Sequence, residues 1–103
     1  MIHYQKNKRK LEFKYSVIIC NRQYDFGNKK YKIFLEVHGD YWHGNPKLYA
    51  NLNSTQKKNV EKDISKKSLA IKYGYKLFTI WENDILNSNF DVLDKIQEYI
   101  NEI

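Results

Sequence analysis

A strand–helix–strand pattern between residues 31 and 82 is the strongest constraint on the fold. Apolar and polar side chains alternate in YKIFLEVH, residues 31–38, which predicts a strand with two distinct faces. One face carries Ile33, Leu35 and Val37, and the other carries Phe34, Glu36 and His38. The segment YKLFTIWE, residues 75–82, is an almost continuous apolar run, typical of a strand buried on both faces of a parallel sheet. Such crossover units are nearly always right-handed, so the two strands should run parallel with a helix over one face.

A helix is predicted between these strands. Asn53 or Ser54 can cap its N-terminus, and Gly74 supplies the left-handed residue at which many helices end. At 100° per residue the helix has an apolar stripe with a polar border. The stripe is Val60, Ile64 and Ile71, and the border is Gln56, Asp63 and Lys67. We expect the stripe to pack on the sheet and the border to face the polar residues of the strand at 31–38.

Further elements flank this unit. Residues 11–20 are rich in β-branched and aromatic side chains, and a second short strand is predicted at 24–26 after a break at 21–23. Both should add antiparallel at one side of the sheet. Residues 89–103 carry Val92, Leu93, Ile96, Tyr99, Ile100 and Ile103 at helical spacing, which predicts a packed helix opened near Asp91. The predicted fold class is α/β, a mixed sheet of antiparallel strands plus a β-α-β crossover, flanked by helices.

The length and the charge of the chain restrict the classes of function that it can have. The 103 residues suit a single domain, 1–103, with a basic N-terminal tail at 1–10 that is either a DNA-contacting arm or a solvated tail. The net charge of +6 is expected of a protein that binds polyanions, although many basic domains bind none. Cys20 is the single cysteine, which excludes an internal disulfide and a Cys-rich zinc site, and its apolar neighbours predict a core thiol. The sequence has no apolar run of a signal or membrane span, so a cytoplasmic or nucleoid-associated location is expected.

Polar groups that carry chemistry concentrate in EVHGDYWHG, residues 36–44. Glu36 and His38 share one face of their strand, and the antiparallel neighbour carrying Asp25 brings a third group within reach. Carboxylates suit a hard cation such as Mg²⁺. Gly39 lets the backbone leave the strand sharply, so Asp40 and His43 are expected to fold back toward the same point.

This set suits phosphodiester hydrolysis, in which a metal polarises the phosphoryl group and an imidazole transfers a proton. Lys67, at the edge of the apolar stripe, is placed to stabilise charge that develops on the phosphate. Tyr41 and Trp42 are either core aromatics or side chains that stack on or wedge between bases. Four further lysines of the predicted helix are expected on its outer side, where they meet phosphates or only water. These are Lys57, Lys58, Lys62 and Lys66.

The sequence resembles the very short patch repair endonucleases and their relatives in the PD-(D/E)XK nuclease superfamily. The likeness lies in residues 24–26, in FLEVHGDYWHG at 34–44, in NVEKD at 59–63 and in GYKLFTIWE at 74–82. The combination in this order is specific, whereas any one piece is weak. The resemblance implies a restriction-endonuclease-like fold and Mg²⁺-dependent hydrolysis of double-stranded DNA, by nicking or cleavage, with Mn²⁺ as an alternative ion.

The resemblance also assigns roles. Asp25 would bind the metal together with the carbonyl of Val37, and His38 and His43 would lie near the scissile phosphate. Trp42, with Tyr41, would match the aromatics that wedge into DNA. Glu36 stands at the carboxylate of the superfamily's Glu-x-Lys signature, with His38 in place of the lysine.

Two departures from the family limit these implications. Asp40 and Asn45 stand where the repair enzymes have ligands of a structural zinc site, so no zinc is expected. A basic segment of about ten residues stands in place of the family's N-terminal helical segment, which leaves open a trimmed relative, one part of a split enzyme, or a homing or restriction module. A homodimer or a partner chain would then supply specificity. The alternatives are a non-catalytic DNA-binding module on the same fold, and a protein-binding subunit with an incidental basic face.

Overall fold

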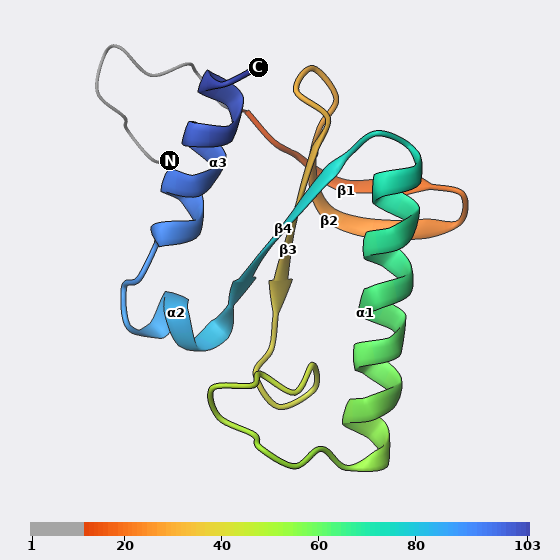
Figure 1. Ribbon diagram of the computed structural model, residues 1–103, viewed down its shortest axis with the longest axis vertical. Coiled ribbons are helices and arrows are strands. Elements are labelled where there is room, and N and C mark those ends of the chain that lie inside the picture. Colours follow the sequence, from red (N-terminus) through yellow and green to blue (C-terminus); the bar gives the residue numbers. More distant parts are fainter. Residues whose placement is uncertain (1–11) are drawn as a thin grey trace.

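A four-stranded mixed sheet forms the centre of the described chain, residues 12–103, in the computed structural model (Figure 1). Its strands are β1 (Lys14–Ile19), β2 (Arg22–Asn28), β3 (Ile33–His38) and β4 (Lys76–Trp81), in the order β1-β2-β3-β4. The β1–β2 and β2–β3 pairs are antiparallel, and β3–β4 is parallel. The predicted α/β class and the β-α-β crossover are therefore confirmed, while the basic segment at 1–10 lies outside the described residues.

The first hairpin turns at Cys20 and Asn21, slightly before the break predicted at 21–23. Both residues have positive φ, 48° and 64°, as a two-residue turn between twisted strands requires. The prediction that Cys20 is a core thiol is wrong, because the turn places its side chain at the surface. Its Sγ instead donates to Tyr73 Oη at 2.7 Å.

The crossover helix α1 (Ser54–Lys72) begins and ends where the sequence indicates. Asn53 accepts from the backbone N–H of Gln56, whose side chain in turn accepts from the Asn53 N–H, a reciprocal pair that satisfies two free amides. After Tyr73 the chain leaves the helix at Gly74, whose φ of +81° favours glycine.

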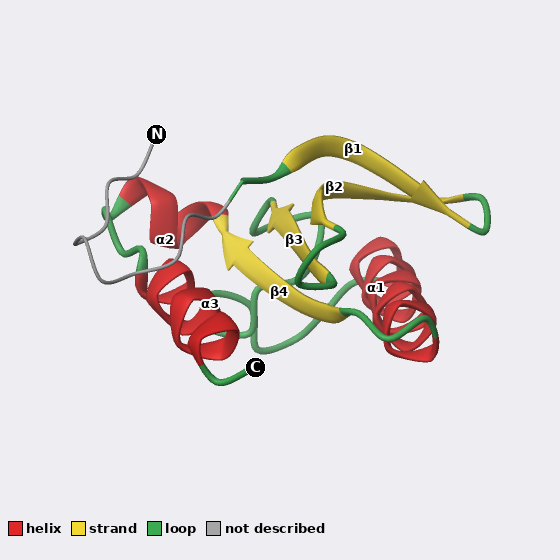
Figure 2. Cartoon of the chain, turned by 90° about the horizontal axis from the view of Figure 1, so that it is seen from above, coloured by secondary structure: helices red, strands yellow, loops and turns green. Residues whose placement is uncertain are grey.

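One face of the sheet packs against the C-terminal helix. The short helix α2 (Glu82–Leu86), which the sequence analysis did not predict, leads from β4 to α3 (Asp91–Asn101). Figure 2 shows α3 and α1 on different sides of the sheet. The buried residues of the α3 side form one apolar cluster: Ile33, Leu35, Ile80, Ile96 and Ile100. The predicted packing of this last helix is confirmed, except that Ile103 is exposed.

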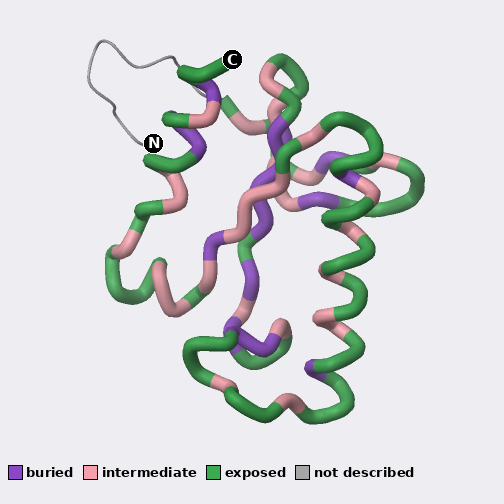
Figure 3. The backbone as a smooth tube through the Cα atoms, in the orientation of Figure 1, coloured by how far each residue is buried: buried purple, intermediate pink, exposed green. Residues whose placement is uncertain are grey.

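The other face carries a smaller apolar cluster beneath α1, made of Val17, Tyr24, Phe34 and Ala70. The predicted apolar stripe of the helix is wrong, because Ile64 and Ile71 are each 61% exposed. The helix is instead rotated so that Gln56, Asp63 and Lys66 turn toward the sheet, with Gln56 almost fully buried, while Lys67 of the predicted border is exposed. Figure 3 shows most of α1 exposed, whereas β3 is buried along much of its length. No helix in residues 12–103 is long and apolar enough to cross a membrane.

This arrangement predicts that two isoleucine-to-alanine substitutions, one in α3 and one in α1, lower the free energy of unfolding by very different amounts. Ile96→Ala removes a fully buried side chain from the α3 cluster and should lower the free energy of unfolding by about 2–5 kcal/mol. Ile71→Ala, on the exposed side of α1, should change it by less than about 1 kcal/mol. Urea denaturation followed by circular dichroism measures both. An equal loss in the two variants would contradict the rotation of α1.

Candidate functional site

Two carboxylates lie side by side where the backbone pairing of β2 with β3 ends. The ladder runs from Asn28–Ile33 to Phe26–Leu35. Beyond it, the N–H of Asp25 donates to Glu36 Oε2 at 2.9 Å, and the N–H of Val37 donates to Asp25 Oδ2 at 2.9 Å. Each acid thus replaces a missing ladder bond of the other strand, which fixes both side chains.

The carbonyl of Val37 belongs to the same group. In an extended strand the N–H and C=O of one residue point to the same neighbouring strand. Since the Val37 N–H points to Asp25, its carbonyl oxygen is directed to that side as well. Of the three oxygen donors predicted from the sequence, Asp25 and Glu36 thus lie side by side, and the Val37 carbonyl is directed to the same neighbouring strand.

Lys66 of α1 is the charge partner of Glu36. Glu36 is only 3% exposed, and a buried carboxylate is strongly destabilising unless it is paired. Lys66 Nζ donates to Glu36 Oε1 and lies 4.8 Å from the centre of the Tyr24 ring, a cation–π contact. The Tyr24 hydroxyl in turn donates to the backbone carbonyl of Lys66 at 2.7 Å. The prediction that Lys66 points outward to DNA is therefore wrong, because the rotation of α1 turns it inward.

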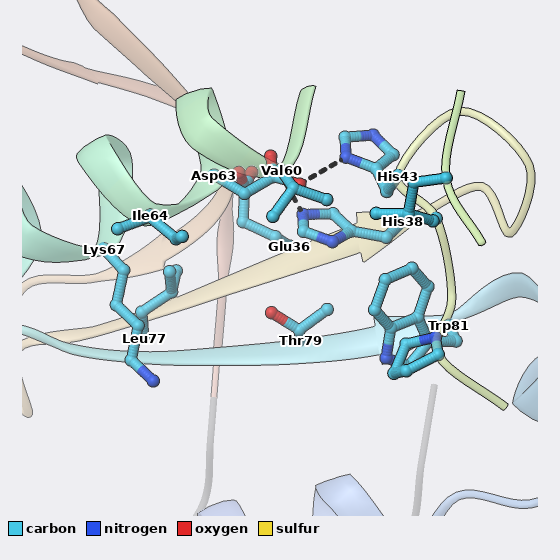
Figure 4. Close-up of a pocket in the computed structure, with 13 residues that line it drawn as sticks. Glu36, His38, His43, Val60, Asp63, Ile64, Lys67, Leu77, Thr79 and Trp81 are labelled. Atoms are coloured by element: carbon cyan, nitrogen blue, oxygen red, sulfur yellow. Dashed lines mark hydrogen bonds and ion pairs between the residues drawn. The ribbon is translucent and has the colours of Figure 1, made fainter. Parts of the chain in front are cut away.

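His38, His43 and Asp63 form a second cluster beside the carboxylates (Figure 4). His38 follows Glu36 by two residues on β3, and His43 returns to it through a turn after Gly39, with its N–H bonded to the Gly39 carbonyl at 3.1 Å. The two imidazole rings stack at a centroid distance of 4.0 Å. Asp63 of α1 lies 2.7 Å from His43 Nδ1 through Oδ2 and 3.8 Å from His38 Nε2 through Oδ1. The predicted approach of the two histidines is thus found.

Burial controls the protonation of His38. Its side chain contacts Trp81 edge to face at a centroid distance of 5.2 Å, and the residue is only 6% exposed. Desolvation, reinforced by neighbouring His43, lowers the pKa of His38 to about 4, against the opposing effect of Asp63. Its Nδ1 is buried and has no hydrogen-bond partner in residues 12–103. His38 is therefore neutral at physiological pH.

Asp40 does not join the site, contrary to the prediction. Its Oδ1 accepts from Asn45 Nδ2 at 2.9 Å and from the backbone N–H of Asn83 at 3.2 Å. These bonds close the loop after β3 and attach it to α2. The same loop turn that returns His43 to the site carries Asp40 to the other side, because Gly39 alone does not fix the direction of the residues that follow.

A cavity of about 370 Å³ opens between α1 and β4 next to these residues (Figure 4). Its polar walls come from the two clusters, and its apolar walls come from the loop, the helix and β4. The lining comprises Glu36, His38, His43, Gly44, Pro46, Leu52, Val60, Asp63, Ile64, Lys67, Leu77, Thr79 and Trp81. Lys67 lines the end near Leu77, away from the histidines, so it is adjacent to the cavity but not in contact with either cluster in Figure 4.

The remaining predicted residues surround the site. Tyr41 and Trp42 are exposed, while their backbone carbonyls accept from Gln56 Nε2 at 2.8 Å and Asn59 Nδ2 at 2.7 Å. The alternative that they are core aromatics is thus excluded. Three of the four outer lysines are indeed exposed on α1: Lys57, Lys58 and Lys62.

Two residues of the site, Asp63 and Lys66, received no chemical role from the sequence. Asp63 was expected only to face the polar residues of β3 as part of the helix border, which the structure confirms, and Lys66 was placed among the outer lysines. A signal was present, because polar side chains follow one another at spacings of three and four along α1, which places them on one face. They are Gln56, Asn59, Asp63 and Lys66.

Comparisons of the chain with models of protein families, with curated proteins and with solved structures find no match.

The lowered pKa of His38 predicts a pH dependence of stability. Between pH 6.5 and about 4 the unfolded chain binds a proton that folded His38 does not, so stability falls as the pH drops through this window. The lost contribution is on the order of 3 kcal/mol at the acid end. Unfolding free energies of the wild type and His38→Gln, measured from pH 7 to 4, should converge as the pH falls. Parallel curves, or an NMR-detected pKa of His38 near 6.5, would refute the assignment.

The Glu36–Lys66 ion pair predicts that substitutions of the two residues have non-additive effects on the free energy of unfolding. Lys66→Met leaves a buried carboxylate without its cation and should lower the free energy of unfolding by about 3 kcal/mol. Adding Glu36→Gln removes the buried charge, so the double variant should be more stable than Lys66→Met alone. Lys62→Met, on the exposed side of the same helix, is the matched control and should be nearly neutral. Additive losses in the cycle would show that the two side chains do not interact.

Proposed function

We propose that this chain is a metal-dependent DNA endonuclease that hydrolyses phosphodiester bonds, on a restriction-endonuclease-like arrangement resembling the very short patch repair enzymes. The observation that carries the proposal is the junction of two clusters on β3. The Asp25–Glu36 carboxylates lie on one side, and the His38–His43–Asp63 group lies two residues further along the strand. A hard-metal site and a positioned base together supply the chemistry of metal-dependent phosphodiester hydrolysis.

The oxygen donors fit Mg²⁺ or Mn²⁺. Asp25 and Glu36 supply carboxylate oxygens and Val37 a carbonyl, which is the donor chemistry that hard divalent cations prefer. Each carboxylate has about four lone-pair sites, so both can hold an ion while keeping the observed hydrogen bonds. When bound, such an ion polarises a phosphoryl oxygen and lowers the pKa of a bound water.

Proton transfer in the proposed reaction would be carried out by His43, positioned by Asp63. Because carboxylate Oδ2 of Asp63 only accepts, the His43 Nδ1 that faces it carries the hydrogen, and in the neutral ring the lone pair is then on Nε2. His43 is therefore held in the tautomer of a general base that accepts a proton from attacking water and returns it to the leaving oxygen. Asp63 is its positioning residue. His38, neutral because of its lowered pKa, stacks against His43 and restricts its ring.

DNA would be held by charge and by stacking. The exposed lysines of α1, Lys57, Lys58 and Lys62, would contact phosphates, and Lys67 at the cavity would stabilise charge on the phosphate. Tyr41 and Trp42 are exposed and would contact bases. The enzyme would act in the cytoplasm or at the nucleoid, with a second copy or a partner chain supplying specificity.

One observation favours a second candidate, a non-catalytic DNA-binding module or the subunit of a split endonuclease. Both oxygens of Glu36 are already bonded to protein donors, Oε1 to Lys66 and Oε2 to the Asp25 N–H. If these contacts persist when DNA binds, Glu36 contributes to packing and not to metal binding. Only a cleavage measurement separates the two candidates.

The test is cleavage of supercoiled plasmid in Mg²⁺ or Mn²⁺ and in EDTA. The wild type should relax or linearise the plasmid only with metal. Asp25→Asn should abolish cleavage, and His43→Ala should slow it by about 10²–10⁴-fold, as expected for loss of a general base. Asp91→Asn, at the start of α3 and away from the site, is the matched control and should cut at the wild-type rate.

Testing several kinds of DNA distinguishes an endonuclease from a non-catalytic DNA-binding module. If plasmid, mismatched duplexes and branched duplexes are all bound with strong salt dependence but never cut, the DNA-binding module replaces the endonuclease. If DNA is not bound at all, both candidates fail and a protein-binding role is left.

A further inference from the structure

We propose that His38, His43 and Asp63 form a binding site for a zinc-class transition-metal ion, separate from the oxygen-donor site at Asp25 and Val37. One ligand atom from each of the three side chains lies within 4.8 Å of the others. The proposal does not depend on nuclease activity, since it rests on the geometry and chemistry of these three groups alone.

The donor separations suit one small ion. Two ligands on a tetrahedral zinc ion lie about 3.4 Å apart, given metal–ligand bonds of about 2.0–2.2 Å. The carboxylate of Asp63 is 2.7 Å from His43 Nδ1 and 3.8 Å from His38 Nε2, so the observed separations lie on either side of that value. These two contacts use different oxygens of Asp63, and an ion between the three side chains would draw both nitrogens and one oxygen toward a common centre from separations of at most 4.8 Å.

The state of His38 points to a ligand as well. Its imidazole is almost fully buried, yet Nδ1 has no hydrogen-bond partner within residues 12–103, and Nε2 is beyond hydrogen-bond distance of Asp63. Buried polar side chains are nearly always bonded, so an imidazole held this way is unusual. The ring atom that faces Asp63 is Nε2, so an ion beside Asp63 would bind there and fix the hydrogen of His38 on Nδ1.

The donor set selects the class of ion. Two imidazole nitrogens and one carboxylate suit Zn²⁺, Co²⁺, Ni²⁺ or Cu²⁺, whereas Mg²⁺ takes oxygen ligands. Three protein ligands leave a fourth position for water, as in open zinc sites. His43 would exchange its Nδ1 hydrogen for the ion and carry that hydrogen on Nε2. The cavity between α1 and β4 is lined by all three residues and offers the ion a path from solvent.

If the chain cuts DNA as proposed, such an ion would inhibit it. Binding occupies the nitrogen atoms of the proposed base and replaces the His43–Asp63 hydrogen bond. The oxygen-donor site would still hold Mg²⁺, so excess Mg²⁺ would not restore activity, whereas a chelator selective for zinc would.

The test is titration of the metal-free protein with CoCl₂, followed by visible absorption and reversed with ZnCl₂. We expect one Co²⁺ per chain with the intense spectrum of a four- or five-coordinate site, displaced by one equivalent of Zn²⁺ and unaffected by excess Mg²⁺. His43→Ala and Asp63→Asn should each weaken binding by more than about 100-fold. Asp25→Asn is the matched control and should bind Co²⁺ as the wild type does. Equal binding by the wild type and His43→Ala would overturn the proposal, as would loss of binding in Asp25→Asn.

A second readout needs no change to the cluster. The chain has two tryptophans, and Trp81 contacts His38 at a centroid distance of 5.2 Å. In a Trp42→Phe protein, Cu²⁺ or Co²⁺ at the site should quench the remaining fluorescence at one equivalent, and unchanged fluorescence would count against the site. Cobalt binding without DNA cleavage would keep this site and remove the proposed function, whereas cleavage by a chain that binds no cobalt would do the reverse.

Discussion

The buried charge of Glu36 governs how the rest of the molecule is put together. A carboxylate on a central strand requires donors from both of its neighbours. β2 supplies the N–H of Asp25, and α1 supplies the ammonium of Lys66. The second contact fixes the rotation of α1 about its axis, and because Asp63 lies three residues before Lys66 on the same face, it also delivers Asp63 to the two histidines. Helix packing and site assembly therefore follow from one requirement.

As a result, the two faces of the sheet are held by different kinds of contact. The α3 side is an ordinary apolar core of isoleucines, a leucine and aromatic rings. The α1 side has a small apolar cluster and a row of hydrogen bonds and ion pairs instead, while Ile64 and Ile71 are mostly exposed. Apolar burial therefore concentrates on the α3 side, and polar contacts concentrate on the α1 side.

Local signals in the sequence were enough to predict the order of the elements except α2. Strand alternation around Glu36, the cap at Asn53 and the stop at Gly74 each act over a few residues, and each was found at or near its predicted position. The face of α1 was not predictable from apolar periodicity, because a long-range ion pair outweighs the burial of two isoleucines. The predictions for Cys20 and Asp40 were wrong for a related reason. The direction of both side chains depends on the geometry of a turn, and the types of the neighbouring residues do not specify that geometry.

The loop that carries Tyr41 and Trp42 combines a fixed backbone with exposed rings. The side-chain amides of Gln56 and Asn59 donate hydrogen bonds to its backbone carbonyls. The side chain of Asn53 donates to the Tyr41 hydroxyl at 3.0 Å. The conformational entropy of this segment is thus already lost when the chain folds. A molecule that docks on these rings meets a preorganised surface, so little further ordering opposes its binding, and the affinity gained per ring is correspondingly larger.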